Sequence, residues 1–510
     1  MTQAHDRASQ KPQDSQPQPP FVLALDVGTS STRAMLFDAA GEAVPQVVSQ
    51  HTYELTTSNE GEVSVDPEML LNVVAQTIDE VLKVAGSRAA QIKAVATDTF
   101  WHTLLGVDAK GHPVTPLITW EDTRAYKASL ELRSQLDEKA VHERTGARFH
   151  ASYWPAKLKW LSEQQPAIVK KVATWLSFGE YMHRQFLGRS VCSLSMASGT
   201  GMLVTRERKW DAELIRTVGI APEQLPKLGD ARDSLQGLTL EYAGRWPALH
   251  DAPWFPALGD GATACIGSGS ASKQNWSLTV GTSSAVRVVV PTQEVVPSDG
   301  LWLYLIDAHR AVLGGALSEG GNLFSWVNKT LKVTDLASVE QEAVKIPPDG
   351  HGLTVLPFIS GERSLGWHAD ARMTMAGLSI HTQPADVLRA LTEALALQLA
   401  IVYEELMKTL KWQGQAPRLL ASGGALVKSD LLRSVIADTV GTPVYPSTDH
   451  EASARGAALL ALEALGVIAD VAQVEPHLTE ATQPDTKNKA IYHKAAQRQR
   501  ELYQLLLHDE

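Results

Sequence analysis

Residues 21–37 read Phe-Val-Leu-Ala-Leu-Asp-Val-Gly-Thr-Ser-Ser-Thr-Arg-Ala-Met-Leu-Phe, two apolar runs separated by the pentapeptide Val-Gly-Thr-Ser-Ser. Short apolar runs on both sides of such a turn predict two antiparallel strands, and further strand signals follow at residues 44–55. The pentapeptide returns at residues 280–284, again between apolar runs and with an arginine soon after it. Because the copies lie about half a chain apart, they predict two α/β lobes of one architecture that arose by duplication.

The repeated turn carries groups that suit a phosphate. Glycine lets the backbone approach a ligand closely, and the amides and hydroxyls that follow it donate hydrogen bonds. A single turn of this kind is usually a plain hairpin, whereas two copies from two lobes could hold a polyphosphate between them. We therefore expect the nucleotide to contact Thr29, Ser30, Ser31 and Arg33 from the first copy and Gly281 and Thr282 from the second.

The residue before the turn differs between the copies, with Asp26 in the first and Thr279 in the second. An acid at a strand end beside a phosphate loop is a natural ligand for Mg²⁺, directly or through water. A second acid would repel the phosphates, and Thr279 avoids that. The sequence predicts Asp26 as part of a magnesium site, with a turn-capping aspartate as the alternative.

The bulk composition narrows the class of protein. A chain of 510 residues exceeds one ordinary core and predicts two large domains. A net charge of −11 without a long Lys/Arg run argues against nucleic acid as a partner. Two cysteines give no disulfide framework, which indicates a cytoplasmic protein. Residues 1–20, rich in Gln, Pro and Ser, predict a disordered tail.

Several other classes lack their signatures. Charged and polar residues interrupt the most apolar stretches, so no membrane span is predicted, and the apolar residues of 386–410 predict a buried core helix. The sequence has no P-loop motif, no H-E-x-x-H or C-x-x-C and no G-x-S-x-G.

Residues 257–264 read Ala-Leu-Gly-Asp-Gly-Ala-Thr-Ala, an aspartate between two glycines at the start of a predicted helix. Phosphoryl transfer to an alcohol needs a carboxylate that accepts the hydroxyl proton, and flanking glycines would leave Asp260 reachable. An ordinary Gly-Asp-Gly turn is the alternative. Taken with the repeated turns, the chain from about Phe21 to about Gly466 resembles the FGGY family of carbohydrate kinases, within the actin-like ATPase superfamily.

The resemblance implies two ribonuclease-H-like domains with a cleft between them. It implies a sugar-binding domain at 21–267 and a nucleotide-binding domain at 268–510. It also implies that Asp260 is the catalytic base, beside substrate and Mg²⁺, and that Gly261 lies next to the substrate.

Two segments resemble the sugar-binding motifs of the family. Asp98-Thr-Phe-Trp101-His102 places Trp101 and His102 where related kinases contact sugar hydroxyls, although a lone histidine is more often structural. Trp120-Glu-Asp122-Thr-Arg124 resembles the family's W-x-D-x-R, and Asp122 could accept hydrogen bonds from the sugar. An internal salt bridge between Asp122 and Arg124 is the alternative.

The nucleotide side has two further glycine-rich segments. Residues 314–321 contain Gly320 ahead of a predicted helix, and residues 418–430 predict a strand, a Gly423-Gly424 turn and another helix. The turn offers a flat backbone ledge for adenine or ribose. By resemblance we expect Gly320, Gly423, Gly424 and Lys428 to bind the nucleotide.

The resemblance implies phosphorylation of a small sugar or sugar acid with ATP and Mg²⁺. Residues 98–102, 119–124, 150–158 and 195–201 are more similar to gluconate kinases than to glycerol kinases, which carry an Arg-Glu pair near 101–102. The favoured reaction is D-gluconate to 6-phosphogluconate, with D-xylulose or another ketose or polyol as the alternative. The gluconate carboxylate needs a cation, and Arg124, Lys157 and His150 are candidates.

Two alternatives come from other classes. An actin- or Hsp70-like ATPase would share the phosphate turns without needing a sugar or Asp260 as base. A catalytically silent sugar-binding regulator is disfavoured by the intact Asp26 and Asp260. The sequence does not give the oligomeric state and is compatible with a homodimer.

Overall fold

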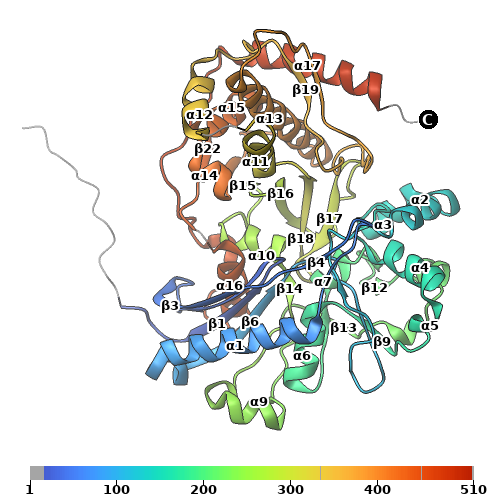
Figure 1. The fold of residues 1–510 in the computed structure, drawn as a ribbon. Helices are drawn as coiled ribbons and strands as arrows, with labels where there is room; N and C mark the ends of the chain where they lie inside the picture. Colours follow the sequence, from blue (N-terminus) through green and yellow to red (C-terminus); the bar gives the residue numbers. More distant parts are fainter. Residues whose placement is uncertain (1–15, 333–334, 450, 508–510) are drawn as a thin grey trace, which may run out of the picture.

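The computed structural model describes residues 16–332, 335–449 and 451–507, which form two lobes that each contain a twisted sheet (Figure 1). Most of the expected tail, residues 1–15, lies outside the described residues. The first sheet has the strand order β14-β6-β1-β2-β3. Its strands are β1 (Phe21–Val27), β2 (Ser31–Phe37), β3 (Ala43–Thr52), β6 (Ile92–Thr99) and β14 (Leu258–Gly259).

The second sheet has the strand order β17-β18-β16-β15-β21-β22. Its strands are β15 (Asn275–Val280), β16 (Ser284–Pro291), β17 (Trp302–Leu305), β18 (Arg310–Leu317), β21 (Arg418–Ser422) and β22 (Val444–Pro446).

The two sheets share one topology apart from the extra edge strand β17. In each, the first strand pairs antiparallel with the second and the second with the third, while the fourth lies parallel to the first and the fifth parallel to the fourth. Each Val-Gly-Thr-Ser-Ser pentapeptide links the first two strands of its own sheet. The duplicated α/β architecture predicted from the repeated turn is therefore confirmed.

Long helices cover the sheets. Helix α1 (Pro67–Ala85) packs its apolar face on the first sheet, and it begins at Asp66, whose carboxylate accepts from the amides of Glu68 and Met69. Helix α13 (Pro384–Thr409) is the buried core helix predicted for 386–410 and packs on the second sheet. Helix α17 (Lys489–Leu506) lies beside α13 and β19 (Thr354–Leu356).

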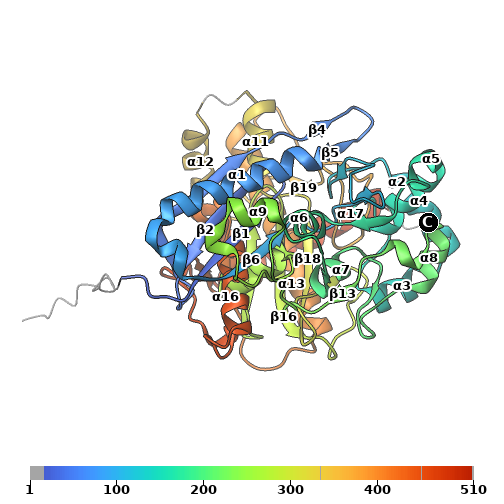
Figure 2. The same cartoon turned by 90° about the horizontal axis from the view of Figure 1, so that it is seen from below.

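Two helices cross between the lobes. Helix α10 (Asp260–Gly267) follows the last strand of the first sheet, and its apolar residues pack with the core of the second. Helix α16 (Ala452–Ala464) follows the last strand of the second sheet and packs on β1 and β6 of the first, where Figures 1 and 2 show it beside the N-terminal strands.

The crossing of α10 and α16 depends on two glycines. A Cβ at Gly456 would lie 1.8 Å from the carbonyl oxygen of Thr263, and one at Gly267 would lie 1.9 Å from that of Ala452. Only glycine allows the two backbones to come this close. Ser453 adds a hydrogen bond of 3.3 Å to the carbonyl of Asp260, so α16 holds the first residue of α10.

Residues 100–257 form an insertion in the first lobe between β6 and β14, with its own apolar cluster. Its helices are α2 (Tyr126–Gln135), α3 (Glu138–Thr145), α4 (Trp154–Gln164), α5 (Pro166–Val169), α6 (Phe178–Leu187), α7 (Leu194–Gly199), α8 (Ala212–Val218) and α9 (Leu240–Arg245). The second lobe adds α11 (Gly321–Thr330), α12 (Leu336–Lys345), α14 (Gly424–Lys428) and α15 (Asp430–Val440).

Cys192 and Cys265 are both buried free thiols. Within the described residues, every helix is too short or too polar to cross a bilayer.

Candidate active site

A cavity of about 360 Å³ brings together residues from both lobes. Its walls include Thr29, Trp101, His102, Trp120, Asp260 and Gly261 from the first lobe. The second lobe contributes Thr279, Ser283, Ser284, Arg287, Trp302, Tyr304, Arg363, Ser422, Gly423 and Asp449. The two repeated turns thus open onto one space, together with the predicted catalytic aspartate.

The first turn is held rigidly. The amide of Gly28 donates to the carbonyl of Ser31 at 3.0 Å, and the hydroxyl of Tyr53 donates to the carbonyl of Gly28. Thr29 faces the cavity, and its Oγ1 accepts from the indole Nε1 of Trp120 at 2.9 Å. Ser30 is exposed and Ser31 half-buried, and neither lines the cavity.

The second turn rests against the start of α11. The amide of Gly281 donates to the carbonyl of Ser283 at 2.9 Å, and the carbonyl of Gly281 accepts from the amide of Gly321 at 2.7 Å. A Cβ at Gly320 would come within 2.8 Å of the turn, so this glycine permits the contact. Ser283 and Ser284 line the cavity, whereas Gly281, Thr282 and Gly320 do not, and Thr282 is exposed.

The Gly423-Gly424 segment also adjoins the second turn. Gly423 has φ of +93°, and a Cβ there would lie 2.5 Å from the carbonyl oxygen of Val280, so only glycine fits. Gly424 is exposed with open space around it, and Lys428 at the end of α14 is exposed as well. Of these three residues, only Gly423 lines the cavity.

Asp260 lies at the first turn of α10, directly after β14. Burial raises the pKa of its carboxyl to about 6, against the opposing hydrogen bond from the Gly261 amide, and the charge of Asp26 adds to the rise. The glycines on either side do more than leave Asp260 reachable. A Cβ at Gly259 would lie 1.9 Å from the ring of Trp101, and one at Gly261 would lie 2.6 Å from it.

Asp26 forms an acidic pair with Asp98, its register partner on the parallel strand β6. Burial raises the pKa of both carboxyls, and each carboxyl also shifts the pKa of the other. Asp98 is fully buried, and the charge of Asp260 contributes to its raised pKa. Arg33 lies 3.7 Å from Asp26 and also pairs with Glu451. This arginine, predicted to contact the nucleotide, therefore lies beside the acidic pair.

One end of the cavity is aromatic. Trp101 and His102 pack against Tyr304, with ring centroids 4.9 and 5.6 Å away, and the hydroxyls of Tyr153 and Tyr304 are hydrogen-bonded. Burial holds the pKa of His102 well below its usual range, so its ring is neutral. Its Nδ1 meets the carbonyl of Gly199 and must carry the proton, which leaves Nε2 as an acceptor for a substrate hydroxyl.

Of the second predicted sugar motif, Trp120 lines the cavity, whereas Asp122 and Arg124 do not. Asp122 is 2% exposed, accepts from the amide of Val63 at 3.0 Å and forms a 2.7 Å ion pair with Arg124. Arg124 also meets Glu62 at 3.3 Å, so the motif forms the internal salt bridge that the sequence left open. This geometry does not bring Asp122 to the residues around Asp260.

Two other candidate cations are also engaged. The amine of Lys157 donates to the carbonyls of His102 and Thr119, both at 2.7 Å, and burial lowers its pKa to about 7. Burial lowers the pKa of His150 to about 3, and its Nδ1 lies 3.0 Å from Ser152 Oγ.

Sequence reasoning missed four side chains at the site. Arg287 and Arg363 line the cavity as cations, Tyr304 forms part of its aromatic end, and Asp98 completes the acidic pair. Asp98 had a signal, since it follows a short, mostly apolar run as Asp26 does. Arg363 carried no such signal in the sequence beyond its position in Gly361-Glu362-Arg363-Ser364. It reaches the cavity only through the fold, from a loop between β19 and β20 (Thr374–Ala376).

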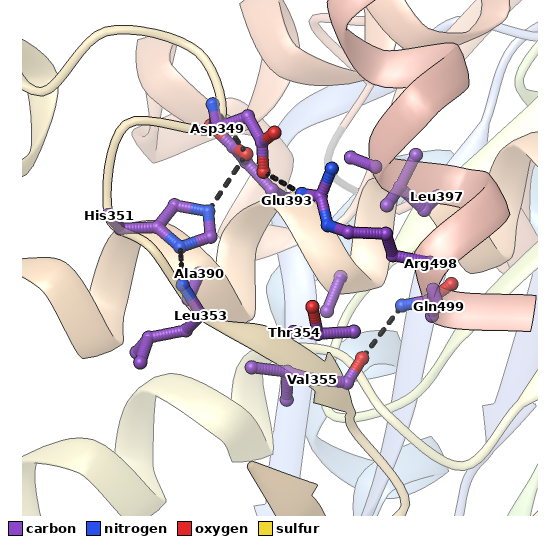
Figure 3. A pocket seen from close by; sticks show the side chains of 12 residues that line it. Asp349, His351, Leu353, Thr354, Val355, Ala390, Glu393, Leu397, Arg498 and Gln499 are labelled. Carbon is purple, nitrogen blue, oxygen red and sulfur yellow. Dashed lines mark hydrogen bonds and ion pairs between the residues drawn. The ribbon is translucent and has the colours of Figure 1, made fainter. Parts of the chain in front are cut away.

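Figure 3 shows a second cluster with metal-ligand residue types, Asp349, His351 and Glu393, in the second lobe. Both ring nitrogens of His351 are engaged, because Nδ1 accepts from the amide of Leu353 and Nε2 lies 3.0 Å from Glu393. Arg389 and Arg498 balance the two acids, each at 2.5 Å. The cluster is a satisfied ion-pair network that ties α17 to α13.

Comparisons with known proteins agree with this arrangement. Models of the FGGY family of carbohydrate kinases match residues 21–267 (N-terminal domain) and 276–465 (C-terminal domain). A gluconokinase of Bacillus subtilis is 26% identical over 459 residues, 88% of each chain.

Two solved structures from Lactobacillus acidophilus, described as a gluconate kinase and a ligand-bound xylulose kinase, each superpose with a TM-score of 0.88 at 27% identity. Each comparison covers 95% of this chain and 98% of the other.

Proposed function

Because the chain belongs to the FGGY family of carbohydrate kinases, we propose that it transfers the γ-phosphoryl group of ATP to the 6-hydroxyl of D-gluconate. The observation that carries the proposal is Asp260, a carboxylate in the cavity onto which both turns and an aromatic sugar-side wall open. A phosphoryl acceptor needs a base at that position, and the turns provide donors for the phosphates.

In the proposed mechanism, Asp260 accepts the proton of the acceptor hydroxyl as that oxygen attacks. A pKa of about 6 leaves the carboxyl mostly ionised at neutral pH and still basic enough to take a proton. Trp101 and His102 orient the sugar, with Nε2 of His102 accepting from a hydroxyl. Thr29 on the first lobe and Ser283 on the second offer hydroxyls to the phosphate oxygens, and the Arg287 guanidinium adds positive charge.

The carboxyl groups of Asp26 and Asp260, beside Asp98, fit a magnesium ion. Asp98 is fully buried and Asp26 half-buried, with Arg33 as the cation nearest Asp26, and the charge of Asp260 acts on Asp98. Carboxylate oxygens are the ligands that Mg²⁺ prefers. We infer that Asp26 and Asp260 hold Mg²⁺, which when bound neutralises phosphate charge.

Gluconate is preferred as substrate over a ketose on two grounds. The relatives include a gluconokinase and a solved gluconate kinase, and residues 98–102 depart from the xylulose-kinase pattern. D-Xylulose is the second candidate, because a solved xylulose kinase is equally similar. The matches give no support to an ATPase without a sugar substrate. ATP as phosphoryl donor and two free thiols support a cytoplasmic location.

A substrate panel tests the proposal. ADP release is measured with Mg-ATP and D-gluconate, D-xylulose, D-ribulose, glycerol or buffer alone, and the product is identified by mass and by the position of its phosphate. We expect turnover with D-gluconate to yield 6-phosphogluconate. If D-xylulose is the only sugar that is turned over, the substrate is reassigned. If ADP release in buffer alone equals that with the sugars, the sugar-kinase proposal is refuted.

A further inference from the structure

We propose that Arg363 is the specificity-determining residue that binds the carboxylate of a sugar-acid substrate. The inference rests on the proposed function, because it names the group that would distinguish gluconate from an uncharged sugar at the same site.

Arg363 reaches the cavity from the second lobe and meets the first lobe there. Its guanidinium lies 5.7 Å from the ring centroid of Trp120, and both side chains line the cavity. Trp120 is itself fixed, because its indole donates to Thr29 Oγ1. The arginine is therefore positioned on a rigid aromatic surface, which reduces the entropy lost when it binds a ligand.

Arg363 lies on the sugar side of the cavity. Burial lowers the pKa of His102 and His150, and the charge of Arg363 adds to that lowering; the same charge opposes the rise that burial gives to the pKa of Tyr153 and Tyr304, the other residues around the aromatic end. Arg287, the other cation in the wall, donates to Thr279 Oγ1 at 3.3 Å, and its charge acts to lower the pKa of Asp260 and of Tyr304. Arg287 therefore lies near Asp260 as well as Tyr304, whereas Arg363 lies over Trp120 and beside the sugar-binding groups.

The guanidinium of Arg363 lacks an acidic partner within residues 16–332, 335–449 and 451–507. The cations that the sequence suggested are engaged elsewhere: Arg124 pairs with Asp122 and Glu62, and Lys157 donates to two carbonyls.

Two acids lie near Arg363 without neutralising it. Glu319 is 1% exposed, and burial raises its pKa to about 8, so it is mostly protonated at neutral pH. Glu362 accepts from the hydroxyl of Tyr503 at 2.8 Å. Arg363 thus remains a half-buried, uncompensated positive charge.

A carboxylate is the chemical group that such a site fits. The planar guanidinium can donate two parallel hydrogen bonds to one carboxylate, and a half-buried pair is weakly screened by water. An uncharged ketose or polyol would leave the charge uncompensated, whereas a sugar acid with its carboxylate at Arg363 would place hydroxyls along Trp101 and His102 toward Asp260.

The test compares D-gluconate with D-gluconamide, a neutral analogue of similar shape. Wild-type protein, Arg363→Gln, Arg363→Lys and the control Arg372→Gln are assayed for kcat and KM with each sugar and with ATP. Arg372 is an exposed arginine of the same loop outside the cavity lining.

For Arg363→Gln we expect KM for D-gluconate to rise about 100-fold, since two charge-assisted hydrogen bonds are lost, while KM for ATP stays unchanged. The preference for gluconate over gluconamide should disappear. The KM of Arg363→Lys for D-gluconate should lie between those of wild type and Arg363→Gln. The KM of the control Arg372→Gln should equal that of wild type. If Arg363→Gln does not fold, the lysine variant and calorimetric binding of gluconate to wild type against gluconamide carry the test.

The other outcomes overturn the inference in distinguishable ways. Wild-type turnover of gluconate with an unchanged KM in Arg363→Gln would refute the role of Arg363 alone. A parallel rise of KM for ATP would reassign the arginine to phosphate. Absence of gluconate binding and turnover in wild type would refute the substrate proposal as well.

Discussion

Asp26 and Asp98 are register partners on the parallel strands β1 and β6, so a half-buried and a fully buried carboxyl group lie side by side. Burial and the neighbouring charge raise the pKa of Asp98 well above its usual value, which favours its protonated form. A protonated carboxyl can donate a hydrogen bond to an ionised partner, which lets Asp26 keep its charge.

This pair predicts different results for two asparagine variants. Asp98→Asn should keep kcat within about threefold, because asparagine copies the neutral, donating form of the acid. Asp26→Asn should raise the Mg²⁺ concentration for half-maximal rate by at least about tenfold, since an ionised ligand is lost. Magnesium titrations of both variants check this. An equal loss in Asp98→Asn would make Asp98 a metal ligand.

Asp260→Asn should lower kcat by about 10²–10⁴-fold while nucleotide affinity stays near wild type, because the proton acceptor is lost and the shape is kept. Steady-state kinetics and ATP titration measure the two effects. Asp251→Asn serves as the control, since the Asp251 carboxylate is 97% exposed. Near-normal kcat in Asp260→Asn would remove Asp260 from the role of base.

The pH dependence of kcat/KM should follow the same carboxyl. Its pKa is raised to about 6, and the base acts only when unprotonated, so activity is present above this pH and falls about tenfold per unit below it. A pH–rate profile between 4.5 and 8 with a stable coupling system measures it. A profile flat down to about pH 4.5 would mean that the base keeps an ordinary aspartate pKa.

Gly456→Ala should destabilise the protein by about 1–3 kcal/mol or more, because the new methyl would overlap the Thr263 backbone, which cannot turn aside as a side chain can. The rate should fall as well, since the displaced α10 carries Asp260. Thermal unfolding and kcat test both effects. Gly244→Ala in α9 is the control, because it adds the same methyl group with no atom within 4 Å. Equal effects in the two variants would contradict the role of the close contact between α10 and α16.

Glu393→Gln should destabilise the second lobe by about 3–5 kcal/mol, because Arg389, 5% exposed, keeps a buried charge without its ionised partner. Burial alone would raise the pKa of Glu393, but His351 and Arg389 hold it below its usual value.

Such a lowered pKa stabilises the fold above the unfolded-state pKa, and the stabilisation is lost as the pH falls through the folded-state pKa. The difference in stability between wild type and Glu393→Gln should therefore be full at pH 7 and become smaller at acidic pH. Urea midpoints of both proteins at several pH values measure this, and a constant difference would contradict the linkage.

The lobes could be predicted from sequence because their signals are local. Each pentapeptide lies between strands that are adjacent in the chain, and the apolar pattern of 386–410 sufficed for α13. Asp260 likewise stands in a compact motif at a helix start.

The cation opposite the sugar could not be predicted in this way. Arg124 and Lys157 were suggested by their nearness to sugar motifs in the chain, yet both are satisfied by local partners. Arg363 reaches Trp120 across more than two hundred residues, and the partnership of Asp26 with Asp98 depends on strand register. Such contacts arise from tertiary packing, which a single sequence does not encode locally.

The reciprocal placement of α10 and α16 has a consequence for synthesis on the ribosome. The face of the first sheet around Val22, Ala24 and Ala96 is covered by α16, which emerges only after nearly the whole chain has been translated. Until residue 464 has left the exit tunnel, this surface stays open to chaperones or to wrong partners, although domains generally fold as they emerge. The first lobe is begun first and can be completed only when the second is nearly finished.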